Sequence, residues 1–90
     1  MFKKPNCPVI AIEEHYWDPE LTKHYTGGDA GRSGDIPARL YNLGAQRLRE
    51  MDEAGIDIQV LSHGSPSTQK LGADVAVALT RGVNDRLAAA

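Results

Sequence analysis

The sequence predicts an α/β fold in which two parallel strands and two helices follow one another in the order β-α-β-α. Two apolar segments, "VIAI" at residues 9–12 and "IDIQVLS" at residues 56–62, have the composition of buried parallel strands. Apolar residues recur at helical spacing after each segment, over about residues 38–54 and from about residue 74 onward. Because a helix joins the two strands, we expect them to be parallel with a right-handed crossover.

The composition indicates one small globular unit of 90 residues with 41% hydrophobic residues, 24% charged residues and a formal net charge of −2. This balance gives no electrostatic reason to expect nucleic acid or a membrane surface as a partner. We also expect no membrane span and no secretory signal, because the apolar runs are short. Cys7 is the only cysteine, which excludes an internal disulfide and suits a cytoplasmic protein with an incidental thiol.

The first predicted strand, residues 9–14, runs directly into acidic and imidazole side chains. Alternate residues of a strand point the same way, so Glu13 and His15 should project together from its C-terminal end, with Glu14 on the other face. A carboxylate and an imidazole are suitable ligands for a divalent metal such as Zn²⁺. The pair therefore predicts either part of a metal site or the solvated end of a strand.

The next segment, about residues 18–37, is predicted to be a long irregular loop because its glycines and prolines oppose regular structure. A single helix should then run from about Ala38 to Ala54 and end at Gly55, a residue suited to a left-handed cap. Its apolar stripe consists of Leu40, Leu43, Leu48 and Met51.

The second strand is predicted over Ile56–Ser62 and is followed by the loop "HGSPSTQ". The last helix should begin near Asp74, a good N-cap residue. Gly82 inside this helix costs about 1 kcal/mol relative to alanine. The apolar face of the helix consists of Val75, Leu79, Val83 and Leu87.

A two-stranded parallel sheet cannot bury both of its faces, and the sequence stops in "LAAA", inside a helical pattern. We therefore expect residues 1–90 to be the beginning of a larger α/β protein. The alternative is a self-contained, non-catalytic α/β module that covers its sheet by self-association.

Two stretches carry a resemblance to a known family. "VIAIEEHYWDPE" and "RLREMDEAGIDIQVLS", residues 9–20 and 47–62, resemble the first strand, first helix and second strand of the amidohydrolase-related (amidohydrolase 2) family of metal-dependent TIM barrels. That family includes the γ-resorcylate, 2,3-dihydroxybenzoate and 5-carboxyvanillate decarboxylases. "SPSTQ" and "AVALTRGVNDRLAAA" resemble the family's segments after the second strand. The resemblance implies that residues 1–90 are the N-terminal β-α-β-α portion of a single (β/α)₈ barrel domain.

The resemblance also implies a function: non-oxidative decarboxylation of a small aromatic carboxylic acid, or hydrolysis by a related enzyme. Glu13 and His15 match the family's metal ligands, which would bind a divalent ion, zinc or manganese. The family's two further ligands and its catalytic acid lie on later strands, so we expect the 90-residue chain alone to be inactive. We also expect a homo-oligomer, with a small aromatic or carboxylated molecule as substrate.

Other side chains could contact substrate. Tyr16 and Trp17 directly follow the predicted ligands and could wall an aromatic ring, or could pack under the long loop. His63, where relatives of the family usually have a small or apolar residue, is either a substrate contact or third ligand, or an exposed loop histidine. Arg47 lies on a helix that should pack outside a barrel, so we expect a surface role for it. Arg32, in the loop, is better placed to reach a substrate.

Overall fold

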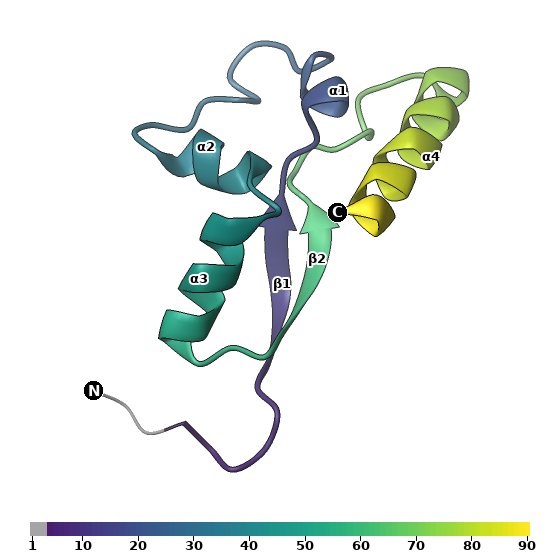
Figure 1. The fold of residues 1–90 in the computed structure, drawn as a ribbon. Coiled ribbons are helices and arrows are strands. Elements are labelled where there is room, and N and C mark those ends of the chain that lie inside the picture. Colours follow the sequence, from purple (N-terminus) through teal and green to yellow (C-terminus); the bar gives the residue numbers. More distant parts are fainter. Residues whose placement is uncertain (1–3) are drawn as a thin grey trace.

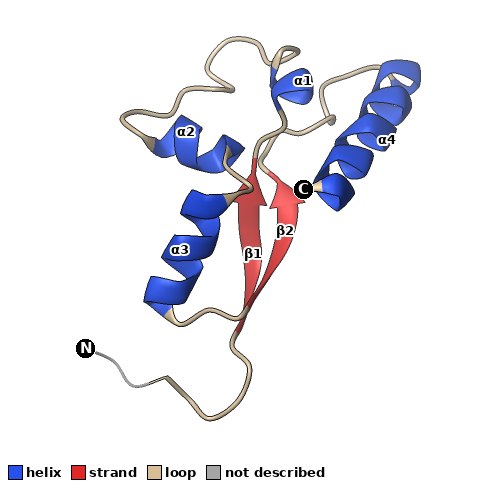
Figure 2. Cartoon of the chain, in the orientation of Figure 1, coloured by secondary structure: helices blue, strands red, loops and turns tan. Residues whose placement is uncertain are grey.

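The computed structural model describes residues 4–90, in which two parallel strands and four helices form an α/β arrangement. Figure 1 shows the strands side by side, with α3 alongside β1 and α4 on the side of β2, and Figure 2 shows the long loops at one end of the strands. The predicted fold class is confirmed, and the arrangement is compatible with the start of a (β/α)₈ barrel. The elements are β1 (Ile10–Tyr16), α1 (Pro19–Thr22), α2 (Ile36–Tyr41), α3 (Ala45–Ala54), β2 (Ile58–His63) and α4 (Ala73–Ala89).

The pairing of β1 with β2 contains a bulge. Ala11 pairs with Gln59 and Glu14 with Leu61, so three steps along β1 correspond to two along β2. After the bulge the pairing continues through residues 15 and 16, so β1 ends two residues later than predicted. A bulge of this kind bends the strand and re-aims its side chains.

The prediction of a single helix over residues 38–54 is wrong, because residues 42–44 separate α2 from α3. Asn42 is extended, with φ −81° and ψ 113°, and its Oδ1 accepts a hydrogen bond of 2.9 Å from the N–H of Gly44. A side chain that bonds to the nearby backbone in this way competes with helical hydrogen bonds. The break places Leu43 against the core.

The predicted cap at the end of α3 is confirmed. Gly55 has φ 74°, and its N–H donates to the carbonyl of Asp52 at 3.2 Å. The N–H of Ile56 closes the cap by donating to the carbonyl of Met51 at 2.9 Å. Because this residue belongs to the cap, β2 begins at Ile58, two residues later than predicted.

The prediction that residues 18–37 form an irregular loop is only partly right. The segment contains α1 and the first two residues of α2. The Oδ1 atom of Asp18 accepts hydrogen bonds from the N–H groups of Glu20 (2.9 Å) and Leu21 (3.2 Å), which makes Asp18 the N-cap of α1. Pro19 occupies the first helical position, where it lacks only an N–H that would be unpaired. A helix of four residues leaves no periodic pattern in the sequence.

The N-cap of α4 is Gly72, and the prediction that Asp74 would fill that position is wrong. Asp74 lies in the first turn instead, where a carboxylate is favoured by the helix dipole. None of the helices in the described part combines the length and apolar content that crossing a lipid bilayer requires.

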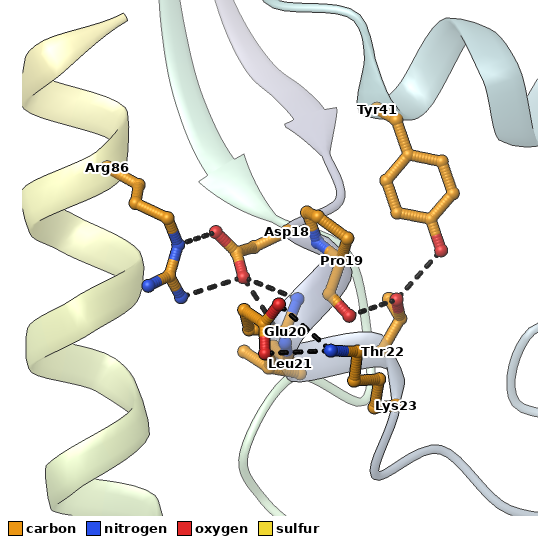
Figure 3. A network of polar contacts seen from close by, with 8 residues as sticks. All are labelled: Asp18, Pro19, Glu20, Leu21, Thr22, Lys23, Tyr41 and Arg86. Carbon is orange, nitrogen blue, oxygen red and sulfur yellow. Dashed lines mark hydrogen bonds and ion pairs between the residues drawn. The ribbon is translucent and has the colours of Figure 1, made fainter.

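Asp18 joins distant parts of the chain. Its carboxylate receives two hydrogen bonds from Arg86 on α4, at 2.7 Å from Nε and 2.9 Å from Nη2 (Figure 3). Its backbone N–H donates to Nε2 of His63, at the end of β2, at 2.8 Å. One residue that is only 5% exposed therefore links the end of β1 to α1, α4 and β2.

The core of the described residues is small. Tyr16, Leu21 and Val83 are 2%, 1% and 4% exposed, so they pack β1, α1 and α4 together. Residues from the segment before α3, from β2 and from α4 also pack against this core. The partly buried residues that surround it are Tyr25, Leu43, Leu61 and Leu87.

Replacing Asp18 tests this junction. Asp18→Ala should lower the free energy of unfolding by roughly 1–3 kcal/mol, because it removes both the cap of α1 and the acceptor for Arg86. Asp18→Asn retains a capping oxygen and should cost less. Urea denaturation followed by circular dichroism measures both, and equal stability of Asp18→Ala and the wild type would contradict the proposed linkage.

The same pair predicts a pH dependence. The hydrogen bonds from Arg86 hold the pKa of Asp18 below its ordinary value, against the opposing effect of burial. Because the pKa is lowered on folding, the stabilisation is complete above the unfolded pKa of about 4 and is lost as the pH falls through the folded pKa. The difference in unfolding free energy between the wild type and Asp18→Asn should therefore shrink on acidification from pH 5 towards about pH 2.

Candidate functional site

Glu13 lies within the bulge of β1, and His15 lies two residues further along the strand. Ile12 and Glu13 stand together opposite Val60, and His15 pairs directly with Ser62. Val60 and Ser62 are two apart on β2 and so share a face of the sheet. Glu13 and His15 therefore stand opposite residues of one face of β2, and the regular alternation expected along the whole strand is interrupted at Glu13 itself.

Glu13 has an unusual backbone conformation. Its φ is 59°, in the left-handed region that residues other than glycine rarely occupy. Such a conformation costs roughly 1–3 kcal/mol and is found most often at functional sites. Glu13 lies within the bulge and is exposed, at the point where a metal ligand is predicted.

Ser62 is the neighbour of the His15 ring. Its Oγ lies 3.1 Å from Nδ1 of His15. When Oγ accepts the hydrogen bond, Nδ1 carries the proton and Nε2 keeps its lone pair, which is the arrangement that a metal-binding histidine needs. Sequence reasoning missed Ser62. The signal was its place at the end of the second predicted strand, but only the register shows that it stands beside His15.

The face that carries these residues is open. Four apolar side chains on the two strands remain exposed on it or at its edge, at 55% for Ile10, 70% for Ile12, 49% for Ile58 and 52% for Val60. Parallel sheets normally have both faces covered. In the described part of the chain, only the opposite face packs against helices and loops, so ligands can reach Glu13 and His15.

The residues present fit part of a metal site. A carboxylate and an imidazole supply oxygen and nitrogen donors, the mixture that zinc accepts. Across residues 4–90, no three histidine, cysteine, aspartate or glutamate side chains are grouped closely enough to hold a metal ion. The donors of this chain could therefore form only a portion of a four-coordinate shell.

Glu14 belongs to the other side of the sheet, as expected from the alternation. It lines a cavity of about 380 Å³ between the strands and the α2–α3 pair, together with Arg39, Arg47 and Glu50. Arg39 and Glu50 form an ion pair at 3.3 Å. Glu14 is thus separated from its two neighbours and does not join them as a third donor.

Tyr16 and Trp17, predicted as possible substrate contacts, pack inside the chain. They are 2% and 3% exposed, and Trp17 makes edge-on contacts with Tyr25 and Tyr41 at ring distances of 6.0 and 5.6 Å. Burial raises the pKa of Tyr16, with a further contribution from the nearby charge of Asp18. This geometry indicates packing beneath the loop, and substrate contact by either ring stays a prediction.

His63 is held by protein groups and is not an exposed loop histidine. Its Nε2 accepts from the N–H of Asp18, and its Nδ1 lies 3.0 Å from the carbonyl oxygen of Gly64. Its ring also meets Tyr16 edge-on at 5.3 Å. These contacts occupy both nitrogens, and the register pairs His63 with Tyr16 and His15 with Ser62. The role of His63 as a ligand or substrate contact stays a prediction.

Arg47 does not have the surface role expected from its helix. Its guanidinium lies between α3 and the sheet and bonds to groups of β1, β2 and the end of α2. Burial lowers the pKa of Arg47, whereas the charges of Glu14 and Glu50 raise it. Arg32, by contrast, is exposed, and the bond found for its side chain is one to the adjacent Gly31 carbonyl at 3.5 Å.

Comparison with known proteins gives one line of support for a relationship. The chain is similar to the γ-resorcylate decarboxylase of Rhodococcus jostii (strain RHA1), with 36% identity over 81 residues. The similarity supports a distant, partial relationship to that enzyme. The match covers 88% of this chain but only 25% of the decarboxylase, so the chain spans about a quarter of the relative's length. No protein-family profile and no solved structure gives a significant match.

Replacing Glu13 with glycine tests the strain at the bulge. Glu13→Gly should raise the free energy of unfolding by about 1 kcal/mol, because glycine adopts a positive φ without a steric penalty. Glu14→Gly is the matched control, and it should lower stability by about 0.5–1 kcal/mol because glycine weakens an ordinary strand position. Chemical denaturation measures both changes. A loss of stability in Glu13→Gly equal to that in the control would contradict the strained conformation.

Proposed function

We propose that this chain contributes Glu13 and His15 to the metal site of a decarboxylase-type enzyme that acts on a small aromatic carboxylic acid. The observation that carries the proposal is the placement of a carboxylate and an imidazole towards one open face, beside a serine that can fix the histidine tautomer. The partial similarity to γ-resorcylate decarboxylase supports a related function within that enzyme's family at most. The aromatic substrate and the choice of decarboxylation over hydrolysis are our proposal.

The chain's own residues have simple roles in this proposal. Glu13 supplies an anionic oxygen, and His15 supplies Nε2 while the Oγ of Ser62 accepts a hydrogen bond from Nδ1–H. A divalent metal, zinc or manganese, would supply Lewis-acid chemistry at the substrate carboxylate. The open apolar face around these residues offers the low-dielectric surroundings that strengthen such electrostatic interactions once it is covered.

The proposal predicts metal binding that depends on both residues. Glu13→Gln and His15→Ala should each weaken the binding of Zn²⁺ to the chain at least about tenfold, because each removes a direct donor. Glu14→Gln is the control, since it removes the same charge from the neighbouring residue on the opposite face. Isothermal titration calorimetry measures the affinities. Equal affinities for Glu13→Gln, Glu14→Gln and the wild type would refute the proposed site.

The exposed sheet face supports a second candidate function, that of a non-catalytic module that associates with its own copies. Ile12 is 70% exposed in the middle of the face, and large exposed apolar patches mark interaction surfaces. In this case the isolated chain should form an assembly of defined size that unfolds cooperatively. An aggregating or incompletely folded chain would favour the enzyme portion instead.

Light scattering on the purified chain distinguishes the two candidates. Ile12→Lys should convert a specific assembly to monomers, because it buries an unpaired charge in the contact. Val77→Lys is a control of similar kind, because Val77 is 54% exposed but lies on α4. A monomeric wild-type chain, or equal effects of the two substitutions, would exclude association through this face.

A further inference from the structure

Arg47 occupies a central position behind the candidate site, on the helix side of the sheet. Its Nε donates to the carbonyl oxygen of Asn42 at 2.7 Å, and its Nη1 donates to Oε1 of Gln59 on β2 at 3.2 Å. Its Nη2 donates to the carbonyl oxygens of His15 and Arg39, each at 3.2 Å. One side chain therefore connects both strands to the break between α2 and α3.

The bond to His15 is the functionally relevant one. The carbonyl that accepts it belongs to the residue whose ring points to the opposite, open face, where it meets Ser62. Directly after the strand, the N–H of Trp17 donates to the carbonyl of Leu40 at 2.9 Å. The backbone that follows the bulge is thus hydrogen-bonded to α3 through Arg47 and to α2 through Leu40. The bulge itself bends the strand just before these bonds.

We propose that Arg47 is a positioning residue for His15, holding the backbone behind the imidazole so that its ring keeps a fixed direction towards the predicted metal. This inference rests on the proposed function for the role of His15. The orientation of His15 by Arg47 is a separate physical statement, because it can be observed without any metal.

Arginine is suited to this task and lysine is not. The planar guanidinium carries five N–H donors in a rigid fork, so it can reach acceptors on several segments at once. The lysine ammonium has its three donors on one atom and cannot span the same set of carbonyl and amide oxygens. The break after α2 also matters, because Asn42 is extended there and its carbonyl oxygen accepts from Nε of Arg47.

A merely structural role for Arg47 would make a different prediction. If it served only to fasten α3 to the sheet, its loss would lower stability and leave the direction of the His15 ring unchanged. If it positions His15, the ring should change its surroundings even in variants that remain folded. The ring nitrogens of His15, seen by ¹⁵N NMR, and the affinity for Zn²⁺ therefore separate the two roles.

The experiment compares Arg47→Lys with Arg39→Lys, a matched control. Arg39 lines the same cavity, and its guanidinium pairs with Glu50 without contacting His15. Arg86→Lys serves as a second control, which weakens the fold through Asp18, the residue that its guanidinium binds. We expect Arg47→Lys alone to shift the His15 ring resonances and to weaken Zn²⁺ binding about tenfold, as loss of an outer contact does at metal sites.

Two outcomes would overturn the proposal: unchanged His15 ring resonances in folded Arg47→Lys, or the same shifts in either control. If Arg47→Lys does not fold, Gln59→Met is the second variant, because it removes one acceptor of the guanidinium. Unchanged His15 ring resonances in folded Gln59→Met would then overturn the proposal. A wild-type chain that does not bind Zn²⁺ would refute the proposed metal site. In that case the ring resonances still decide whether Arg47 positions His15.

Discussion

The structure depends on the hydrogen bonds that converge on Asp18. This residue caps α1, receives two bonds from Arg86 on α4 and donates its N–H to His63 at the end of β2. With so few fully buried side chains in the described part, apolar burial alone gives limited stability. A buried carboxylate that satisfies several donors then determines how the loops and α4 close over one end of the sheet.

Closure on one side leaves the other side open, and the candidate site lies there. The helices and loops pack against the face that carries Leu61, while Ile12 and Val60 remain exposed on the opposite face. Glu13 lies in the bulge opposite Val60, and His15 follows the bulge and pairs with Ser62 on the same face of β2. In our proposal the uncovered sheet face and the incomplete set of metal donors have one explanation. Further protein covers the face and supplies the remaining donors.

Residues on both faces of the sheet contact the residues of the candidate site. On the open face, Ser62 orients the ring of His15, and the bulge holds Glu13 in a strained conformation. On the helix face, Arg47 holds the carbonyl of His15 and the end of α2. The positive φ of Glu13 is a cost that an ordinary strand position avoids, and strained residues cluster at functional sites, which supports the proposed role of Glu13.

Residue patterns were sufficient to predict the α/β fold class and the left-handed cap at Gly55, because apolar periodicity and a glycine cap depend on residues only a few positions apart. The metal itself remains a prediction. The break at Asn42, the partnership of Ser62 with His15 and the burial of Arg47 became visible only in the folded chain. The last two depend on contacts between segments that are distant in sequence, and a local pattern contains no information about the register or the groups that will meet.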